Sequence, residues 1–248
     1  NLMELLKTLC HIHAPSGEEL ALSEFLLDYI EKHKSNWVVQ PKVFHGDGFQ
    51  DCIVLVFGKP TTAIFAHMDS IGFTAKYGNE IVKIGGPVTT EGIELIGEDG
   101  HGKVSGTIVH KKDENGNTSL HISGRPIDRG TSLTFKPNFI ETEDFIQSCY
   151  MDNRLGVWNA LKVAENLENG IICFSSWEEH GGGSVGYLAK FIYETYNVKQ
   201  ALISDITWVT DGVEHGKGVA ISMRDSGIPR KSYVDRIINL AQESQIPF

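Results

Sequence analysis

The sequence lacks several features that would assign a protein class at once. Its four cysteines are scattered without a Cys-x-x-Cys pair: Cys10, Cys52, Cys149 and Cys173. We therefore expect free thiols in a reducing compartment, the cytoplasm, and no disulfide framework. No apolar run approaches the roughly 18 residues that a membrane-spanning helix needs. Residues 1–7 show no basic segment followed by an apolar core, so no signal peptide is visible.

Positive charge is also scarce. The chain has 22 Lys and Arg against 32 Asp and Glu, a net charge of −10. Nucleic acids and anionic membrane surfaces select basic patches, so we expect neither as a partner. Repeats and low-complexity linkers are absent. What the 248 residues do contain is 41% hydrophobic side chains, enough for a sizeable core.

The hydrophobic pattern predicts an α/β chain that is interrupted by a β-rich unit and then resumed. The expected helices cover residues 3–10, 20–33, 153–167, 184–196 and 229–242, and the expected strands of the α/β part cover residues 38–44, 51–57, 62–66, 170–176, 200–204 and 218–223. Ser16 and Glu19 have the spacing of a capping box before the second helix. We expect residues 1–70 and 147–248 to form the α/β domain, and the glycine-rich residues 71–146 to form the inserted β-rich domain.

His67 and Asp69 follow the apolar strand at residues 62–66, two positions apart. Side chains alternate across a strand, so both project to the same side. The imidazole could then bind a metal through one nitrogen while Asp69 accepts the N–H of the other. The alternative is a histidine at a strand end beside an unrelated turn aspartate.

Three acidic clusters follow downstream, each where a strand ends or a helix begins. Asp152 opens the helix after the insertion, Glu178 and Glu179 follow the strand at 170–176, and Asp205 follows the next strand. Ligands bind at this edge of open α/β sheets, and clustered carboxylates repel one another unless cations lie among them. Nitrogen and oxygen ligands without thiolate suit zinc, cobalt or manganese. Taken singly, Asp152 could cap a helix, Asp205 could form a turn, and the glutamates could be a solvated loop.

Four motifs occur together in one order: His67-Met68-Asp69-Ser70-Ile71-Gly72, Met151-Asp152-Asn153-Arg154-Leu155-Gly156, Glu178-Glu179-His180-Gly181 and Ser204-Asp205. As a set they resemble the glutamyl and deblocking aminopeptidases of the tetrahedral aminopeptidase type, which are co-catalytic dinuclear metallopeptidases. The resemblance covers nearly the whole chain. It implies a three-layer α/β/α, zinc-aminopeptidase-like domain with an inserted small β-rich, barrel-like domain.

The resemblance also implies an activity and its residues. The chain would be a metal-dependent aminopeptidase that removes N-terminal residues from peptides with a free N-terminus. Two divalent ions, zinc first and cobalt or manganese as alternatives, would activate a water. The implied ligands are His67, Asp152 as the bridge, Glu179 and Asp205; Glu178 would be the general base and Asp69 the orienter of His67. A cis peptide bond after Asp152 and a homo-oligomer built through the insertion are further implications.

Two alternatives stay open. A related metallo-carboxypeptidase or deacylase branch shares the His-x-Asp and Glu-Glu pairs, but there the histidine and the bridging aspartate lie close in sequence. A catalytically dead homologue that binds peptides or one metal is the other. The family supplies a last histidine ligand near its C-terminus, and neither His180 nor His215 matches that position. We therefore expect the second part of the α/β domain to be C-terminally incomplete.

Overall fold

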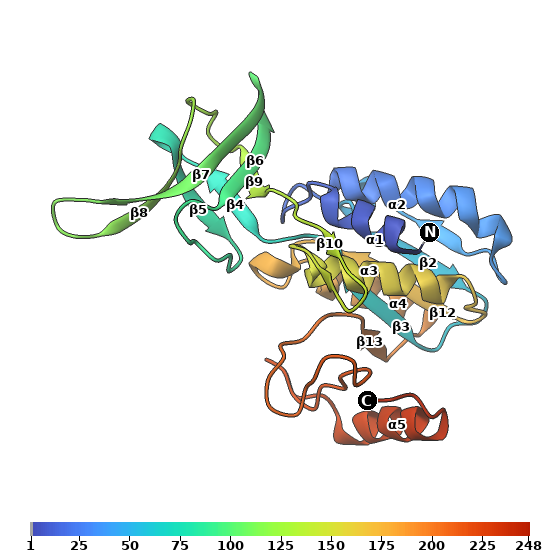
Figure 1. Cartoon of the computed structure of the whole chain (residues 1–248). Helices are drawn as coiled ribbons and strands as arrows, with labels where there is room; N and C mark the ends of the chain where they lie inside the picture. The colour runs from blue at the N-terminus through green and yellow to red at the C-terminus, as the bar shows by residue number, and fades with distance from the viewer. Residues whose placement is uncertain (1) are drawn as a thin grey trace. The chain divides into compact units, whose positions relative to one another are not determined.

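The computed structural model describes residues 2–248, which divide into two compact units between Asp205 and Ile206. The first unit contains a sheet with helices on both faces and a barrel of short strands (Figure 1). The second contains one helix, α5 (Lys231–Glu243), and irregular chain. No helix within residues 2–248 combines the length and apolar character needed to cross a membrane.

The central sheet has five strands in the order β1-β2-β12-β3-β13. Their bounds are β1 (Lys42–Phe44), β2 (Ile53–Phe57), β3 (Ala63–His67), β12 (Gly170–Ser175) and β13 (Ala201–Ile203). Strand β3 pairs in parallel with β12 and with β13, whereas β2 is antiparallel to both of its neighbours. All residues of β2 and β12 are buried, which explains why these strands are continuous apolar runs without alternation.

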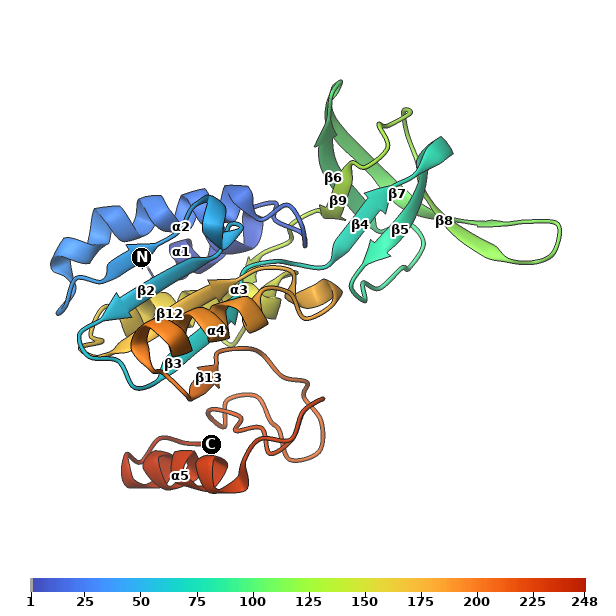
Figure 2. The ribbon, with the colours of Figure 1, turned by 180° about the vertical axis from the view of Figure 1, so that it is seen from behind.

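Helices cover both faces of this sheet (Figures 1 and 2). Helices α1 (Leu2–His11), α2 (Leu20–His33) and α3 (Met151–Ala164) share one core cluster with Leu55 of β2. Helix α4 (Val185–Tyr196) packs in a second cluster with Val54, the preceding residue of the same strand. Because neighbouring residues of a strand point to opposite faces, the two clusters lie on opposite sides of the sheet. The predicted three-layer α/β/α arrangement is therefore present.

A closed barrel lies in the chain between β3 and α3, with strand order β4-β5-β8-β7-β6-β9. Its strands are β4 (Gly72–Ala75), β5 (Glu80–Ile84), β6 (Glu94–Asp99), β7 (Gly102–Lys112), β8 (Thr118–Ile122) and β9 (Ser132–Phe135). Phe73 opposite Leu133 closes the barrel between β4 and β9, and both side chains lie in its core. A hairpin of β10 (Ile140–Glu141) and β11 (Ile146–Gln147) follows. The domain boundaries at residues 70 and 146 stay a prediction.

Three local predictions were wrong. Residues 38–41 do not belong to the first strand, which begins at Lys42. Ser16 and Glu19 do not form a capping box, because Ser16 donates to Asp69 and the Glu19 carboxylate accepts N–H groups of Gly17 and Trp177. Residues 218–223 do not form a strand; Val219 donates its N–H to Pro247 in an isolated bond. An apolar run becomes a strand only where another strand edge pairs with it, and within the described Ile206–Phe248 unit no strand does so.

Candidate metal centre

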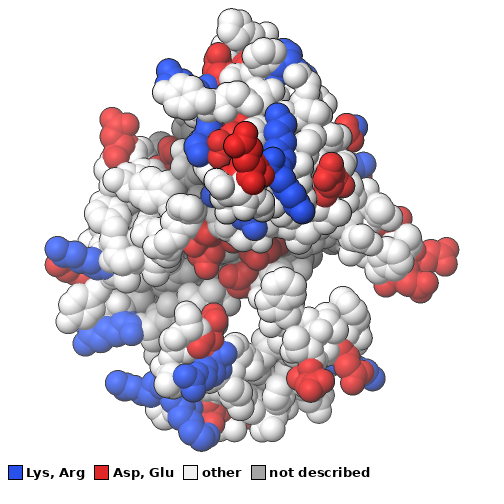
Figure 3. All heavy atoms as spheres, turned by 90° about the vertical axis from the view of Figure 1, so that its left-hand side faces the viewer, with Lys and Arg blue, Asp and Glu red and all other residues white. Residues whose placement is uncertain are grey.

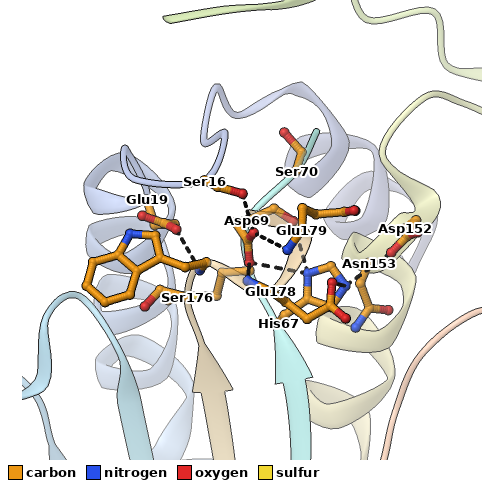
Figure 4. A network of polar contacts seen from close by, with 12 residues as sticks. Ser16, Glu19, His67, Asp69, Ser70, Asp152, Asn153, Ser176, Glu178 and Glu179 are labelled. Carbon is orange, nitrogen blue, oxygen red and sulfur yellow. Dashed lines mark hydrogen bonds and ion pairs between the residues drawn. The ribbon is translucent and has the colours of Figure 1, made fainter. Parts of the chain in front are cut away.

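The carboxyl ends of the three parallel strands bring the predicted site residues together. Ser175 of β12 lies opposite His67 of β3, so the residues after each strand run side by side. Met68 donates its N–H to Ser175 at 2.8 Å, and Ser204 after β13 donates to Phe65 of β3 at 2.8 Å. The short 3-10 helix η4 (Glu178–His180) begins three residues after β12 ends. Figure 4 shows the side chains that these strand ends place around His67.

His67 is the centre of this group, with only 4% of its surface exposed. Its Nε2 lies 3.1 Å from Asp152 Oδ1, 3.6 Å from Glu178 Oε2 and 3.7 Å from Asp205 Oδ2. The side chains of Asp152 and Glu178 are 49% and 45% exposed. The imidazole side of the centre is therefore closed and the carboxylate side is open to solvent.

Asp69 lies behind His67, fully buried. The Nδ1 of His67 is 3.1 Å from the backbone oxygen of Asp69 and 3.4 Å from its Oδ1. The same carboxylate accepts the N–H groups of Glu178 and Glu179, each at 3.0 Å, and the Ser16 hydroxyl at 2.6 Å. One side chain thus faces the second nitrogen of His67 and also fixes the backbone that carries both glutamates.

Asp152 enters from the start of α3. The peptide bond between Asp152 and Asn153 is cis, which confirms that prediction. Asn153 donates to Ser204 at 2.8 Å and accepts the N–H of Gly156 at 3.1 Å, so it connects the helix start to the end of β13. This connection holds the segment that carries Asp152 beside the segment that carries Asp205.

The electrostatics of the centre reflect its many carboxylates. Burial alone would lower the pKa of His67, but hydrogen bonds to Asp152 and Asp69 and nearby negative charge raise it to about 11. Burial and the charge of Asp152 raise the pKa of Glu179 to about 7. Burial raises the pKa of Glu178 as well, and Asp205 adds to the shift. Figure 3 shows several groups of acidic side chains on one face of the molecule. The centre therefore favours an added positive charge.

The donor set fits divalent metal ions. His67, Glu178 and Asp205 offer ligand atoms within 4.8 Å of one another, and so do His67, Asp152 and Glu179. All donors are imidazole nitrogen or carboxylate oxygen, which suits zinc, cobalt or manganese. Both groups use His67, and one Nε2 binds one ion at a time. A second ion at this centre would depend on the carboxylates and on further ligands.

The sequence interpretation assigned Ser16 and Glu19 to a helix cap and so missed their contacts with the site. Both lie on the turn before α2 and contact the strand-end segments (Figure 4). The only signal was a serine and a glutamate three residues apart before an apolar helix. A capping box has the same signal, so spacing alone could not separate the two interpretations.

The family model of the M42 glutamyl aminopeptidases matches residues 117–248, more than half of the chain. The chain belongs to the M42 glutamyl aminopeptidase family. It is accordingly a peptidase, a hydrolase of peptide bonds, and the predicted family is confirmed. The matched residues include three of the four predicted motifs, those with Asp152, Glu178 and Asp205. No curated protein matches the chain.

Solved structures show the same fold as this M42 chain. A TET aminopeptidase from a marine sediment archaeon of the Thaumarchaeota is 18% identical, with a TM-score of 0.79 over 99% of this chain and 80% of that one. An aminopeptidase from Desulfurococcus kamchatkensis is 22% identical, with a TM-score of 0.77 over 99% and 78%. The TET1 peptidase of Pyrococcus horikoshii is 20% identical, with a TM-score of 0.75 over 100% and 83%. These matches confirm the predicted fold class.

Proposed function

We propose that this M42 peptidase is a metal-dependent aminopeptidase with a dinuclear centre. His67 and Asp205 would hold one ion, Glu179 would hold the other, and Asp152 would bridge them. Asp69 would orient His67 through the face that carries Nδ1. The observation that carries the proposal is the convergence of one imidazole and four carboxylates on the carboxyl edge of β3, β12 and β13.

Glu178 is the proposed general base. Its carboxylate lies 3.6 Å from His67 Nε2, inside the cluster, and its raised pKa brings it closer to neutral pH, where a base that both takes and returns a proton works best. When bound, the ions would act as Lewis acids on water and the peptide carbonyl and would anchor the free α-amine. Glu178 takes a proton from the attacking water as the water oxygen bonds to the carbonyl carbon. Glu178 then returns that proton to the leaving amine as the C–N bond breaks.

The division of the pair, with Glu178 as base and Glu179 as ligand, is the one that the family resemblance implies, and the backbone contacts fix both residues. Asp69 fixes the N–H groups of both residues, so the two side chains start from rigid, adjacent positions. Adjacent carboxylates on one fixed turn can divide the work, one ligating and one accepting the proton. Zinc is the proposed metal because it suits this donor set and this chemistry.

The test is hydrolysis of glutamyl and leucyl 4-nitroanilides by the purified chain after chelation and after zinc is restored. We expect activity only with zinc, and two zinc ions per chain by calorimetry. Glu178→Gln should keep zinc binding and lose about 10²–10⁴-fold in kcat, the range for a general base. The matched control is Glu194→Gln on α4, whose side chain is exposed.

A chain that binds one ion or none and hydrolyses neither substrate would support the second candidate, a peptide- or metal-binding homologue without activity. One observation favours keeping that candidate. Both ligand groups among the described residues share His67, so only one of two ions could have an imidazole ligand from them.

We also propose a homo-oligomer built through the barrel. The Pyrococcus horikoshii relative can assemble into a tetrahedron or a large octahedral shell. Light scattering coupled to size-exclusion chromatography should give a mass that is a multiple of one chain. A single-chain mass at micromolar concentration would contradict this.

A further inference from the structure

The segment after β12 exposes three consecutive backbone N–H groups to two buried carboxylates. Asp69 accepts the N–H groups of Glu178 and Glu179, and Glu19 accepts that of Trp177 at 3.0 Å. Glu19 is 1% exposed and Asp69 is fully buried. Trp177 has a φ of 59°, in the left-handed region that non-glycine residues rarely adopt. Local preference therefore does not hold this turn in place, and its hydrogen bonds must.

Glu19 is itself held firmly. Its Oε1 also accepts the N–H of Gly17 at 3.0 Å, and its backbone oxygen accepts the N–H groups of Leu22 and Ser23 in the first turn of α2. Burial raises the pKa of Glu19, and the two N–H donors act against that rise. The carboxylate reaches the Trp177 backbone from the start of α2. Figure 4 shows Glu19 at this position, on the same segment as Ser16.

The turn before α2, which carries Glu19, also contacts Asp69. The Ser16 hydroxyl donates to Asp69 Oδ2 at 2.6 Å. Residues 16 to 19 thus contact both segments that support the centre, the one with Asp69 and the one with the two glutamates. Ser16 holds the carboxylate behind His67, and Glu19 holds the first N–H of the segment that carries the glutamate pair.

Resting on the function proposed above, we propose that Glu19 is a positioning residue for Glu178 and Glu179. Its carboxylate accepts the backbone N–H groups of Gly17 and Trp177, and it acts through the Trp177 backbone. Without its oxygen, the N–H groups of Trp177 and Gly17 lose their acceptor and the turn relaxes from its left-handed conformation. Displacement by about 1 Å of a group that must meet the substrate can cost about 10²-fold in rate.

Three substitutions of Glu19 separate the effect of the position of its side-chain oxygen from the effect of its charge. Glu19→Gln keeps an oxygen at the same distance and removes the charge. Glu19→Asp keeps the charge and withdraws the oxygen by about 1.5 Å, one carbon–carbon bond. Glu19→Ala removes both. The control is Glu24→Ala, which removes an exposed carboxylate one turn later on the same helix.

We expect Glu19→Gln to stay within about threefold of the wild-type kcat, and Glu19→Asp and Glu19→Ala to lose about 10–100-fold with KM changed far less. The second readout needs no metal. Amide hydrogen exchange of the metal-free protein should speed up at Trp177 and Gly17 in Glu19→Asp and Glu19→Ala, and should be unchanged in Glu19→Gln and Glu24→Ala.

Two results would overturn the proposal. One is a folded Glu19→Asp with wild-type kcat and wild-type exchange at Trp177. The other is a Glu19→Gln that keeps slow exchange at Trp177 and still loses more than tenfold in kcat, since charge and not positioning would then matter. If Glu19→Ala does not fold, the Asp and Gln variants decide alone. An inactive wild-type enzyme would remove the proposed function, while the exchange data would still test whether Glu19 holds the turn.

Discussion

Arg154 is a charged side chain with no exposed surface, and its hydrogen bonds go to backbone oxygens. It donates to Met68 at 3.0 Å, to Ile12 at 2.9 Å, to Ala14 at 3.5 Å and to Leu9. Burial lowers its pKa to about 10, so it stays charged at neutral pH. One guanidinium thereby connects the end of β3, the segment before α2 and the start of α3, which are the segments around His67 and Asp152.

Arg154→Met should destabilise the protein by about 3–5 kcal/mol. Several buried carbonyls would lose their donor, and each unsatisfied buried group costs about 1–3 kcal/mol. Urea unfolding followed by circular dichroism measures this. Arg129→Met is the control, because Arg129 is exposed on the barrel, and it should change stability by less than about 1 kcal/mol. Equal effects of the two substitutions would contradict the role given to Arg154.

The metal-free protein should lose stability as pH rises from 6 to 9. The pKa of His67 is raised from 6.5 to about 11 in the folded state. A raised pKa gives stability that is fully present below the unfolded value and is lost as pH rises through the folded value. Glu179, raised from 4.5 to about 7, acts in the same direction at lower pH. Scanning calorimetry should show Tm falling, by about 2–4 °C for each kcal/mol lost, and His67→Gln should flatten the dependence. A Tm that rises over this range would be the contrary result.

Most of the cluster around His67 could be predicted from sequence because His67, the two glutamates and Asp205 lie at the ends of strands, and parallel strands end at one edge; Asp152 instead opens a helix. Ser16, Glu19 and Arg154 could not be given their roles in this way. Their partners lie far away in the chain, and for Glu19 and Arg154 they are backbone groups, which leave no residue-type signal. Ser16 and Glu19 were in addition explained equally well by a local motif.

Helix α3 and the end of β13 approach closely at Gly156. A Cβ on Gly156 would lie 2.2 Å from the Ser204 backbone oxygen and 2.2 Å from Asn153 Oδ1. The glycine therefore sets the distance between the helix that carries Asp152 and the segment that carries Asp205. Its place in the middle of a helix, otherwise unfavourable, has a packing reason.

Gly156→Ala should destabilise the fold by about 2–4 kcal/mol, since backbone and the Asn153 amide must move apart. Gly186→Ala in α4 is the matched control. A Cβ there meets nothing within 4 Å, so the helix should gain about 0.5–1 kcal/mol. Opposite shifts of Tm for two helical glycines are the expected outcome, and shifts of the same sign would contradict the packing argument.

The elements themselves were predictable where the apolar period was clear. Strands β3, β12 and β13 agree with the predicted strands to within one residue at each end, and α1 to α5 agree to within a few residues. Val38 was wrongly placed in the first strand; it donates its N–H to Glu165 and is 59% exposed. Whether such a short apolar run becomes a strand depends on a neighbouring strand that pairs with it. That neighbour is set by the whole fold and cannot be found in the run itself.

Metal binding should stabilise the chain as a whole, because the proposed ligands come from four segments spread between His67 and Asp205. An ion that binds only the folded state at 100 times its Kd adds about 2.7 kcal/mol. Zinc should therefore raise Tm by about 5–10 °C, and a chelator should reverse this. Asp152→Asn should reduce the shift, whereas Asp128→Asn on the barrel should not. An unchanged Tm with zinc would argue against a built site.

The closed barrel has a consequence for the order of folding. His67 and Asp152 touch at 3.1 Å but lie 85 residues apart in the chain. Once Phe73 pairs with Leu133, the barrel is a ring and only the two connections remain to be closed. Shortening the effective loop from 85 to about 25 residues lowers the entropic free-energy cost of closing it by about 1 kcal/mol. A substitution that opens the barrel would therefore weaken the contact between His67 and Asp152 without touching either residue.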